Sequence, residues 1–216
     1  MFFIFNNKEE YILYMTYQSA HTINYSELWL SFINGNDESF SLIYKLSYKS
    51  LYSYGLSFKI PEEQVRDIMQ DLFVKLYTKP ELVKDVKTLK PFLFAAIKNA
   101  CLNILKTGQK NINLDTIDNF EIRYSIKEDQ ISNKEEEEHI KSVVEKILSQ
   151  LTPRQKEIIY LRFLHQMEYA EIAQIMNLSE QSARNLIHRA MEKIRKENEG
   201  QDFLTFMLFL LIFYKL

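Results

Sequence analysis

Residues 169–189, with the sequence YAEIAQIMNLSEQSARNLIHR, predict two short helices separated by a tight turn. In the first helix Ile172, Ala173 and Met176 share one apolar face, and Ala173 is small enough for a second helix to cross closely. Asn177 stands at the turn, where the backbone must reach left-handed geometry, which Asn tolerates at lower cost than most residues. This pattern is typical of a helix-turn-helix.

The second helix begins after Ser179, a favourable N-cap, and its period predicts that Ala183, Leu186 and Ile187 are buried. In a helix-turn-helix the early turns of this helix enter the major groove of DNA, where Arg and Asn can read base edges. The candidate side chains for duplex recognition are Gln181, Ser182, Arg184, Asn185, His188 and Arg189. The alternative is a helical hairpin with a solvated polar face.

Composition limits the other possibilities. The net charge of the 216 residues is −2, so any nucleic-acid footprint must be local. The single Cys101 falls on an apolar helix face, which favours a buried thiol over a nucleophile and excludes a multi-cysteine zinc site. Glycines and histidines lack the spacing of a phosphate loop or a metal site, so we expect no enzyme, no cofactor and no metal. The N-terminus lacks the order of a secretory signal, and we expect a cytoplasmic protein.

The expected fold class is all-α, with two helical domains joined by an acidic linker. An N-terminal extension, residues 1–25, shows no sustained period, and the first helical domain covers residues 26–108. Asp37 is expected to cap the long helix of this domain. Pro61 favours the first turn of the next helix, about residues 61–78, whose polar face is explained as well by solvent exposure as by binding.

A basic helix closes the first domain. Residues 84–110 contain six lysines and one aspartate, a local charge of +5. Basic groups interleaved with aromatic and amide side chains suit single-stranded nucleic acid, because bases stack on rings while lysines contact phosphates. The candidates are Lys90, Phe94, Lys98, Asn99 and Asn103. A basic amphipathic helix whose aromatic rings lie in the core explains this segment equally well.

The second half of the chain contains a linker, a domain and a tail. Residues 109–139 are strongly acidic and show no clear period, which is typical of a linker. The domain at residues 140–198 contains a capping box at Thr152 and Gln155 and ends with the helix-turn-helix. The tail, residues 199–216, is apolar.

The order of these parts resembles an extracytoplasmic-function (ECF) sigma factor of bacterial RNA polymerase, in the sigma-70 family. The matching strings are VRDIMQDLFVKLY, TLKPFLFAAIKNACLNILK and LTPRQKEIIYLRFLHQMEYAEIAQIMNLSEQSARNLIHRAMEKIRK. They fall within residues 26–107 and 140–197, and their order makes the resemblance specific. The third string alone would also fit a two-component response regulator.

The resemblance implies a sigma-two-like first domain and a sigma-four-like second domain. Residues Lys90, Phe94, Lys98, Asn99 and Asn103 would capture the non-template strand of the minus-ten element, and the recognition helix would read the minus-thirty-five element. The acidic linker would thread toward the RNA exit path. The side chains that would dock on the clamp of core RNA polymerase are Asp67, Gln70, Asp71 and Val74. The implied partners are core polymerase, promoter DNA and an anti-sigma factor, with no small-molecule substrate.

Three positions depart from the family pattern. Ala95 stands where an arginine is frequent, which puts one contact to the strand backbone in doubt. Asn177 replaces the usual turn glycine, which is tolerable, and Leu186 occupies a position that is often basic. Because Leu186 carries no charge, we expect the recognition helix to bind DNA phosphates more weakly.

Two other functions fit part of the chain: a stand-alone transcription regulator with the same helix-turn-helix, and a helical adaptor that binds no DNA. Neither needs the basic helix or the clamp-docking helix of the first domain.

The tail has no explanation in DNA binding. Only Thr205 is polar between residues 203 and 214, so a helix there would be apolar on all sides. Residues 203–216 would span only about 21 Å at ~1.5 Å per residue, too short for a bilayer core of ~30 Å. We expect the tail to pack on one of the domains, and the alternative is docking on an anti-sigma protein or a membrane surface.

Overall fold

The computed structural model describes residues 25–83, 89–108, 120–122, 134–198, 202–206 and 210. Within these ranges the elements are helices joined by turns, without a strand, and the predicted all-α class is confirmed. The first half contains α2 (Tyr25–Ile33), α3 (Asp37–Leu56), α4 (Glu62–Thr78), the short 3-10 helix η1 (Pro80–Leu82) and α5 (Leu89–Gly108). The second half contains α6 (Lys134–Ser149), α7 (Pro153–Ile159), the π-helical segment η4 (Tyr160–Leu164), α8 (Tyr169–Met176) and α9 (Glu180–Glu197).

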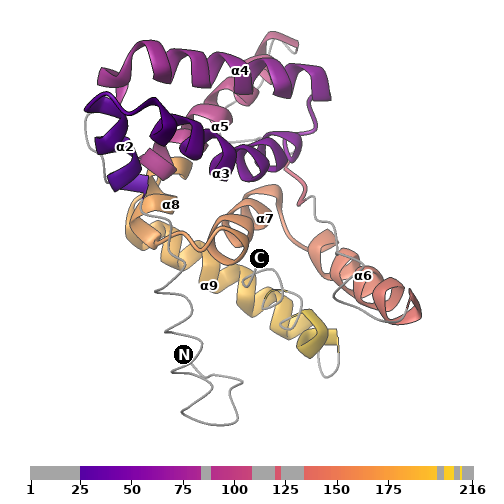
Figure 1. The fold of residues 1–216 in the computed structure, drawn as a ribbon. Coiled ribbons are helices and arrows are strands. Elements are labelled where there is room, and N and C mark those ends of the chain that lie inside the picture. The colour runs from indigo at the N-terminus through magenta and orange to yellow at the C-terminus, as the bar shows by residue number, and fades with distance from the viewer. Residues whose placement is uncertain are drawn as a thin grey trace, which may run out of the picture.

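Helices α2 to α5 form the first module, at the top of Figure 1. The apolar face of α4 is buried through Val65, Met69 and Phe73. Helix α4 crosses α3 at Gly55, where a Cβ atom would lie only 2.7 Å from Cγ1 of Val65. Because real Cβ contacts are longer than this, a side chain at that position would have to displace the packed side chain of Val65.

The N-cap of α3 is Asn36, so the predicted cap at Asp37 is wrong by one residue. The Asn36 side chain accepts hydrogen bonds from the backbone N–H groups of Glu38 and Ser39, at 3.0 and 3.3 Å. Asp37 is instead the first helical residue, where its negative charge lies at the positive end of the helix dipole.

Helices α6 to α9 with η4 form the second module, whose local geometry agrees with the sequence. Asn177 ends α8 in the left-handed region, with φ 52° and ψ 54°, and the hydroxyl of Ser179 accepts a hydrogen bond from the N–H of Ser182. Thr152 and Gln155 form the predicted capping box in front of α7. Helix α6 begins at Lys134, before the start that we predicted at residue 140.

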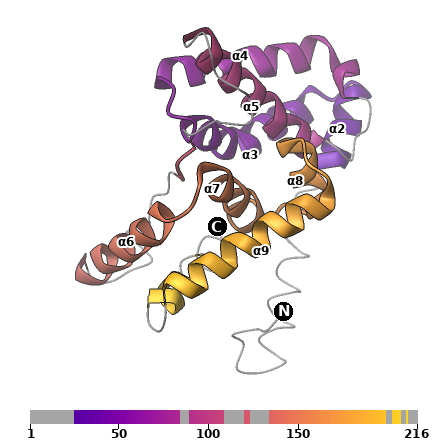
Figure 2. The ribbon, with the colours of Figure 1, turned by 180° about the vertical axis from the view of Figure 1, so that it is seen from behind.

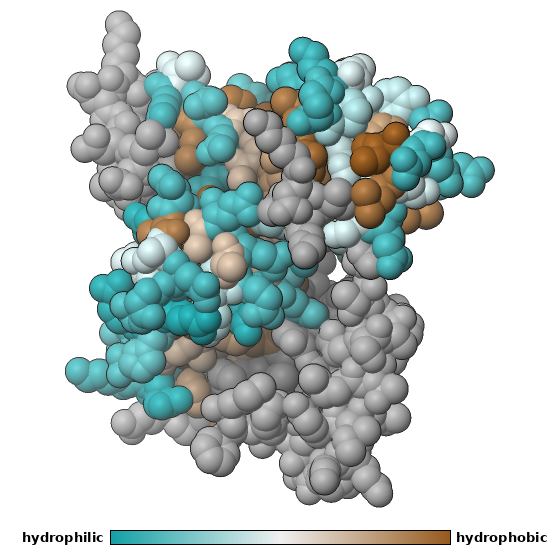
Figure 3. Space-filling model, turned by 90° about the vertical axis from the view of Figure 1, so that its left-hand side faces the viewer, coloured by the Kyte–Doolittle hydropathy of each residue, from teal (hydrophilic) through white to brown (hydrophobic). Residues whose placement is uncertain are grey.

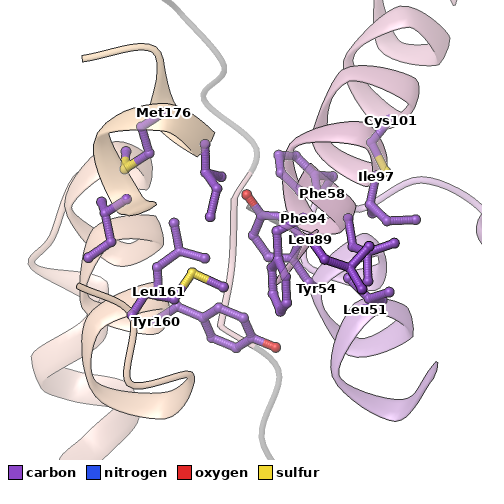
Figure 4. Packing of buried hydrophobic residues seen from close by; sticks show 14 of the residues in the cluster. Leu51, Tyr54, Phe58, Leu89, Phe94, Ile97, Cys101, Tyr160, Leu161 and Met176 are labelled. Carbon is purple, nitrogen blue, oxygen red and sulfur yellow. The ribbon is translucent and has the colours of Figure 1, made fainter. Parts of the chain in front are cut away.

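The two modules share one apolar core. In the two opposite views of Figures 1 and 2, α7 and α8 lie directly below α3 and α5. Figure 4 shows Tyr160 and Leu161 of the second module facing Tyr54 and Phe94 of the first. The sequence had left the arrangement of the modules open; in this structure they are in direct contact.

Phe120, between the modules in sequence, is part of this shared core. Its ring lies 5.2 Å from that of Phe58, 5.8 Å from that of Tyr54 and 5.7 Å from that of Tyr160, and it is 2% exposed. The backbone N–H of Glu121 donates a 2.8 Å hydrogen bond to the carbonyl of Ser57. Most of the predicted linker lies outside the described residues, but this short piece of it is anchored to the first module.

A second apolar cluster joins α6, the end of α9 and the tail. Phe206 is fully buried and Leu210 is 3% exposed, in contact with the apolar faces of α6 and α9. Asp202 pairs with Lys146 on α6 at 2.8 Å. For the described part of the tail, packing within the chain is therefore confirmed. Among the described residues, no helix is both long enough and apolar enough to span a membrane.

Candidate nucleic-acid interface

The recognition helix, α9, presents the predicted polar face to solvent. The six candidates are all exposed: Gln181, Ser182, Arg184, Asn185, His188 and Arg189. On the opposite face Ala183 and Ile187 are buried, as the period predicts, whereas Leu186 is only half-buried. Figure 3 views the side of the molecule on which α8 and the start of α9 lie, and hydrophilic side chains cover most of its described surface. The helix can therefore meet a DNA groove without rearrangement of its own module.

Several recognition side chains are held by their neighbours. The guanidinium group of Arg184 pairs with Glu180 and lies over the Tyr169 ring, 4.1 Å from its centroid. The guanidinium group of Arg162 lies over the same ring at 4.8 Å. Gln181 donates a 3.0 Å hydrogen bond to the side chain of Asn185. Ion pairing and cation–π contact restrict the rotamers of Arg184 before any DNA arrives.

The strand-binding candidates of α5 divide into two groups. Asn99 and Asn103 are exposed, and Asn99 lines a cavity of about 410 Å³ between α5 and the second module. Lys90 and Lys98 are largely buried and Phe94 is 2% exposed, because α8, Glu157 of α7 and His165 lie against α5. Lys90, Phe94 and Lys98 thus pack against the second module rather than face solvent.

The contact at Lys98 is a buried ion pair. Its Nζ donates hydrogen bonds of 2.7 and 2.9 Å to the two carboxylate oxygens of Glu157 on α7. The two side chains are 13% and 7% exposed. A charge-assisted pair of this geometry is strong, but loss of either partner would leave a charge buried without compensation.

The contacts at Lys90 and Phe94 involve His165, which follows η4. Lys90 donates a 2.7 Å hydrogen bond to the backbone carbonyl of His165. The Phe94 ring meets the imidazole edge to face at 4.8 Å. The imidazole Nε2 is buried and has no hydrogen-bond partner among the described residues.

Burial at this interface changes several pKa values. Burial, with a smaller effect of the Lys90 charge, lowers the pKa of His165 to about 3. Burial likewise lowers the pKa of Lys90 and raises that of Tyr160 to about 12. Burial and then the Glu157 charge raise the pKa of Tyr54 well above its usual value. At neutral pH the interface therefore holds a neutral imidazole and two protonated phenols.

The residues predicted to dock on polymerase lie on the outer face of α4. Asp67, Gln70, Asp71 and Val74 are all exposed, Val74 to 54%. Gln70 and Val74 line a groove of about 590 Å³ between α3 and α4, together with aromatic side chains. The aromatic members of this groove are Phe40, Tyr44, Tyr48, Phe73 and Tyr77.

Sequence reasoning missed the partners of the basic helix. Glu157 on α7 lies 59 residues from Lys98 in the chain, and Phe120 lies in a segment without period. One signal was present, because residues 158–161 are four consecutive apolar residues and such a run predicts a helix buried on all sides. The structure buries all of residues 157–161.

Among the described residues, no group of three or more His, Cys, Asp or Glu side chains could hold a metal ion. Cys101 is buried, and burial raises its pKa to about 12, which makes it unreactive as a thiolate.

Known proteins that are similar to this chain belong to one family. The family model described as Sigma-70, region 4 matches residues 142–194. The ECF RNA polymerase sigma factor SigM of Bacillus subtilis (strain 168) is 23% identical over 153 residues, covering 71% of this chain and 91% of that protein. The ECF RNA polymerase sigma-E factor of Escherichia coli (strain K12) is 26% identical over 168 residues, 74% of this chain and 86% of that one.

A solved structure resembles the fold. The structure of CnrH in complex with the cytosolic domain of CnrY matches with a TM-score of 0.51 and 21% identity, over 79% of this chain and 94% of that chain. At this identity the likeness concerns the fold.

Proposed function

The chain belongs to the ECF sigma factors of the sigma-70 family, and from this premise we propose that it binds core RNA polymerase and directs promoter recognition and opening. It is an alternative sigma factor for transcription initiation. In this proposal the protein acts in the cytoplasm, and it binds its partners without catalysing a reaction.

The observation that carries the proposal is the recognition helix. Six polar side chains, three of them basic or imidazole groups, stand exposed on the early turns of α9, while its opposite face is buried. Helix-turn-helix proteins place this part of the helix in the major groove, where Arg and Asn make bidentate contacts with guanine and adenine. We assign Arg184, Asn185 and Arg189 to the reading of base edges in the minus-thirty-five element.

The basic helix α5 supports strand capture. Lys90, Phe94 and Lys98 share one face, and Asn99 and Asn103 lie on a neighbouring, exposed face. Lysines, an aromatic ring and amides are the groups that hold single-stranded DNA. Since α8, Glu157 and His165 cover the first three, strand capture in this proposal requires the second module to move away from α5.

The outer face of α4 supports docking on polymerase. The groove lined by Gln70 and Val74 contains apolar rings and the charged Arg66, and the exposed carboxylates of Asp67 and Asp71 lie on the same helix outside the groove. An apolar centre with a charged rim is the usual composition of a protein–protein interface.

Run-off transcription with purified core RNA polymerase tests the proposed function. Templates drawn from the host genome are transcribed with core alone and with core plus this protein. We expect new, promoter-dependent transcripts only with the protein. Specific binding of duplex DNA without any stimulation of core polymerase would favour the stand-alone regulator instead. Without either activity the proposed function is wrong.

A further inference from the structure

We infer that residues 157–165 occupy, within the same chain, the site on α5 that takes single-stranded DNA. The segment and the strand are then mutually exclusive ligands of Lys90, Phe94 and Lys98. This inference rests on the proposed function, since it takes α5 as the strand-binding helix. It assigns to the α7–η4 segment a role as a mimic of the strand that holds the protein closed until the two modules separate.

The carboxylate of Glu157 stands where a phosphate would be expected. It presents two anionic oxygens to Lys98 Nζ, at 2.7 and 2.9 Å, as the two non-bridging oxygens of a phosphodiester can. The same carboxylate accepts a 2.6 Å hydrogen bond from the hydroxyl of Tyr54. Lys98 contacts an anion in both states, so its positive charge stays compensated whichever ligand is bound.

The rings of the segment cover aromatic side chains of the first module that a base could otherwise contact. The imidazole of His165 meets the Phe94 ring at 4.8 Å, and the Tyr160 ring lies nearly parallel to that of Tyr54, 5.9 Å away. A nucleic-acid base offers the same flat surface to an aromatic side chain. The carbonyl of His165, which accepts from Lys90, adds an oxygen acceptor of the kind that phosphates and bases carry.

A strand and the segment cannot occupy this face together. Phe94 is 2% exposed and the Lys98 side chain 13%, so neither can contact DNA while the segment is in place. The Phe120 ring contacts both modules, through Tyr54 and Tyr160. In the closed state the segment binds Lys90 and Lys98, and in the open state the strand binds them. A ligand that binds only one of two states shifts the equilibrium toward that state.

The test measures binding of a fluorescein-labelled, mixed-sequence single-stranded oligonucleotide to the full-length protein, by anisotropy at one fixed salt concentration. Glu157→Gln keeps the shape but removes the charge that compensates Lys98. We expect this variant to bind the oligonucleotide at least tenfold more tightly than the wild type. Glu145→Gln, an exposed position on α6, is the matched control and should bind like the wild type. The combined change Glu157→Gln with Lys98→Met should lose the gain.

Distance measurement separates opening from a general loss of folding. Two fluorophores are attached to cysteines introduced by Thr107→Cys on α5 and Lys196→Cys on α9. Both positions are exposed, whereas the native Cys101 is buried and is not labelled. Glu157→Gln should lengthen the distance between them with helical content unchanged, and added oligonucleotide should lengthen it in the wild type. The exchanged pair, Lys98→Glu with Glu157→Lys, should restore the short distance, because the ion pair is kept. It should not bind the strand, because α5 then carries a negative charge at position 98.

Two results would overturn the inference. One is oligonucleotide binding that is equal in the wild type and in Glu157→Gln, and the other is binding at an unchanged short distance. Failure of the proposed function is distinguishable from these, because it would appear as absence of promoter-dependent transcription with core polymerase in every variant.

Discussion

The phenol of Tyr54 donates a 2.6 Å hydrogen bond to Oε1 of Glu157, a residue 103 positions later in the chain. Tyr54 is fully buried in the first module and Glu157 is 5% exposed in the second. The raised pKa of Tyr54 keeps its hydroxyl protonated, so it remains a donor over the physiological pH range. This bond and the pair between Lys98 and Glu157 share one carboxylate, which ties α3, α5 and α7 together.

Removal of that hydroxyl should destabilise the closed protein. Hydrogen bonds to charged groups contribute about 1.5–3 kcal/mol, so Tyr54→Phe should lower the free energy of unfolding by that amount in urea denaturation. Tyr52→Phe is the control, because the Tyr52 hydroxyl bonds Glu62 at an exposed site. Equal losses in the two variants would contradict a special role for the buried bond.

The closed state should weaken as the pH falls below neutrality. The pKa of His165 is about 3 in the folded protein against an ordinary 6.5, so the unfolded chain binds a proton first. The stabilisation is complete above pH 6.5 and is lost as the pH falls toward 3, which amounts to about 2 kcal/mol between pH 6.5 and 5. His165→Phe should flatten this dependence in urea titrations. His139→Gln, at an exposed position on α6, should keep the wild-type slope, and a steep slope in His165→Phe would refute the assignment.

The two DNA-contacting helices should fail in different ways. Arg184→Ala or Arg189→Ala should cost about 1–3 kcal/mol at particular upstream base pairs, because a bidentate contact is lost. Asn99→Ala should instead impair selection and opening at the downstream element. Promoter libraries scored with each variant measure this difference, and Lys196→Ala, exposed in the last turn of α9, is the control. Matching loss profiles for the two helices would contradict the division of labour.

The outer face of α4 should control association with core polymerase. A double change of Gln70 and Asp71 to Ala should weaken co-purification with core, while stability changes by no more than about 0.5 kcal/mol, since both side chains are exposed. Glu63→Ala, on the first turn of the same helix, is the control. Undiminished co-purification of the double variant would remove α4 from the docking surface.

The tail should act as part of the core of the second module. Phe206→Ala should lower the free energy of unfolding by about 3–5 kcal/mol, because the side chain is fully buried between α6 and α9. Leu204→Ala is the control, as Leu204 is 55% exposed. A chain ending at Gly200 should expose the same apolar surface and aggregate. A monodisperse, equally stable truncated protein, with a full-length form that partitions into membranes, would favour the membrane alternative.

Much of the local structure could be predicted from the sequence, because it depends on neighbours along the chain. The left-handed Asn177, the capping box at Thr152 and the burial of Ala183 and Ile187 each follow from a few consecutive residues. The exposed face of α9 follows from the same period. Cap placement was less secure, as the shift from Asp37 to Asn36 shows, because both side chains can accept the same N–H groups.

Only the tertiary structure decided what covers each helix. Periodicity identifies an apolar face but not its partner, so nothing local distinguishes Lys98 in solvent from Lys98 against Glu157. The same holds for Phe94, which belongs equally to a strand-binding face or to a core. Phe94 lies in the core because burial of apolar surface between distant segments removes the rings of Tyr54, Phe94 and Tyr160 from water together.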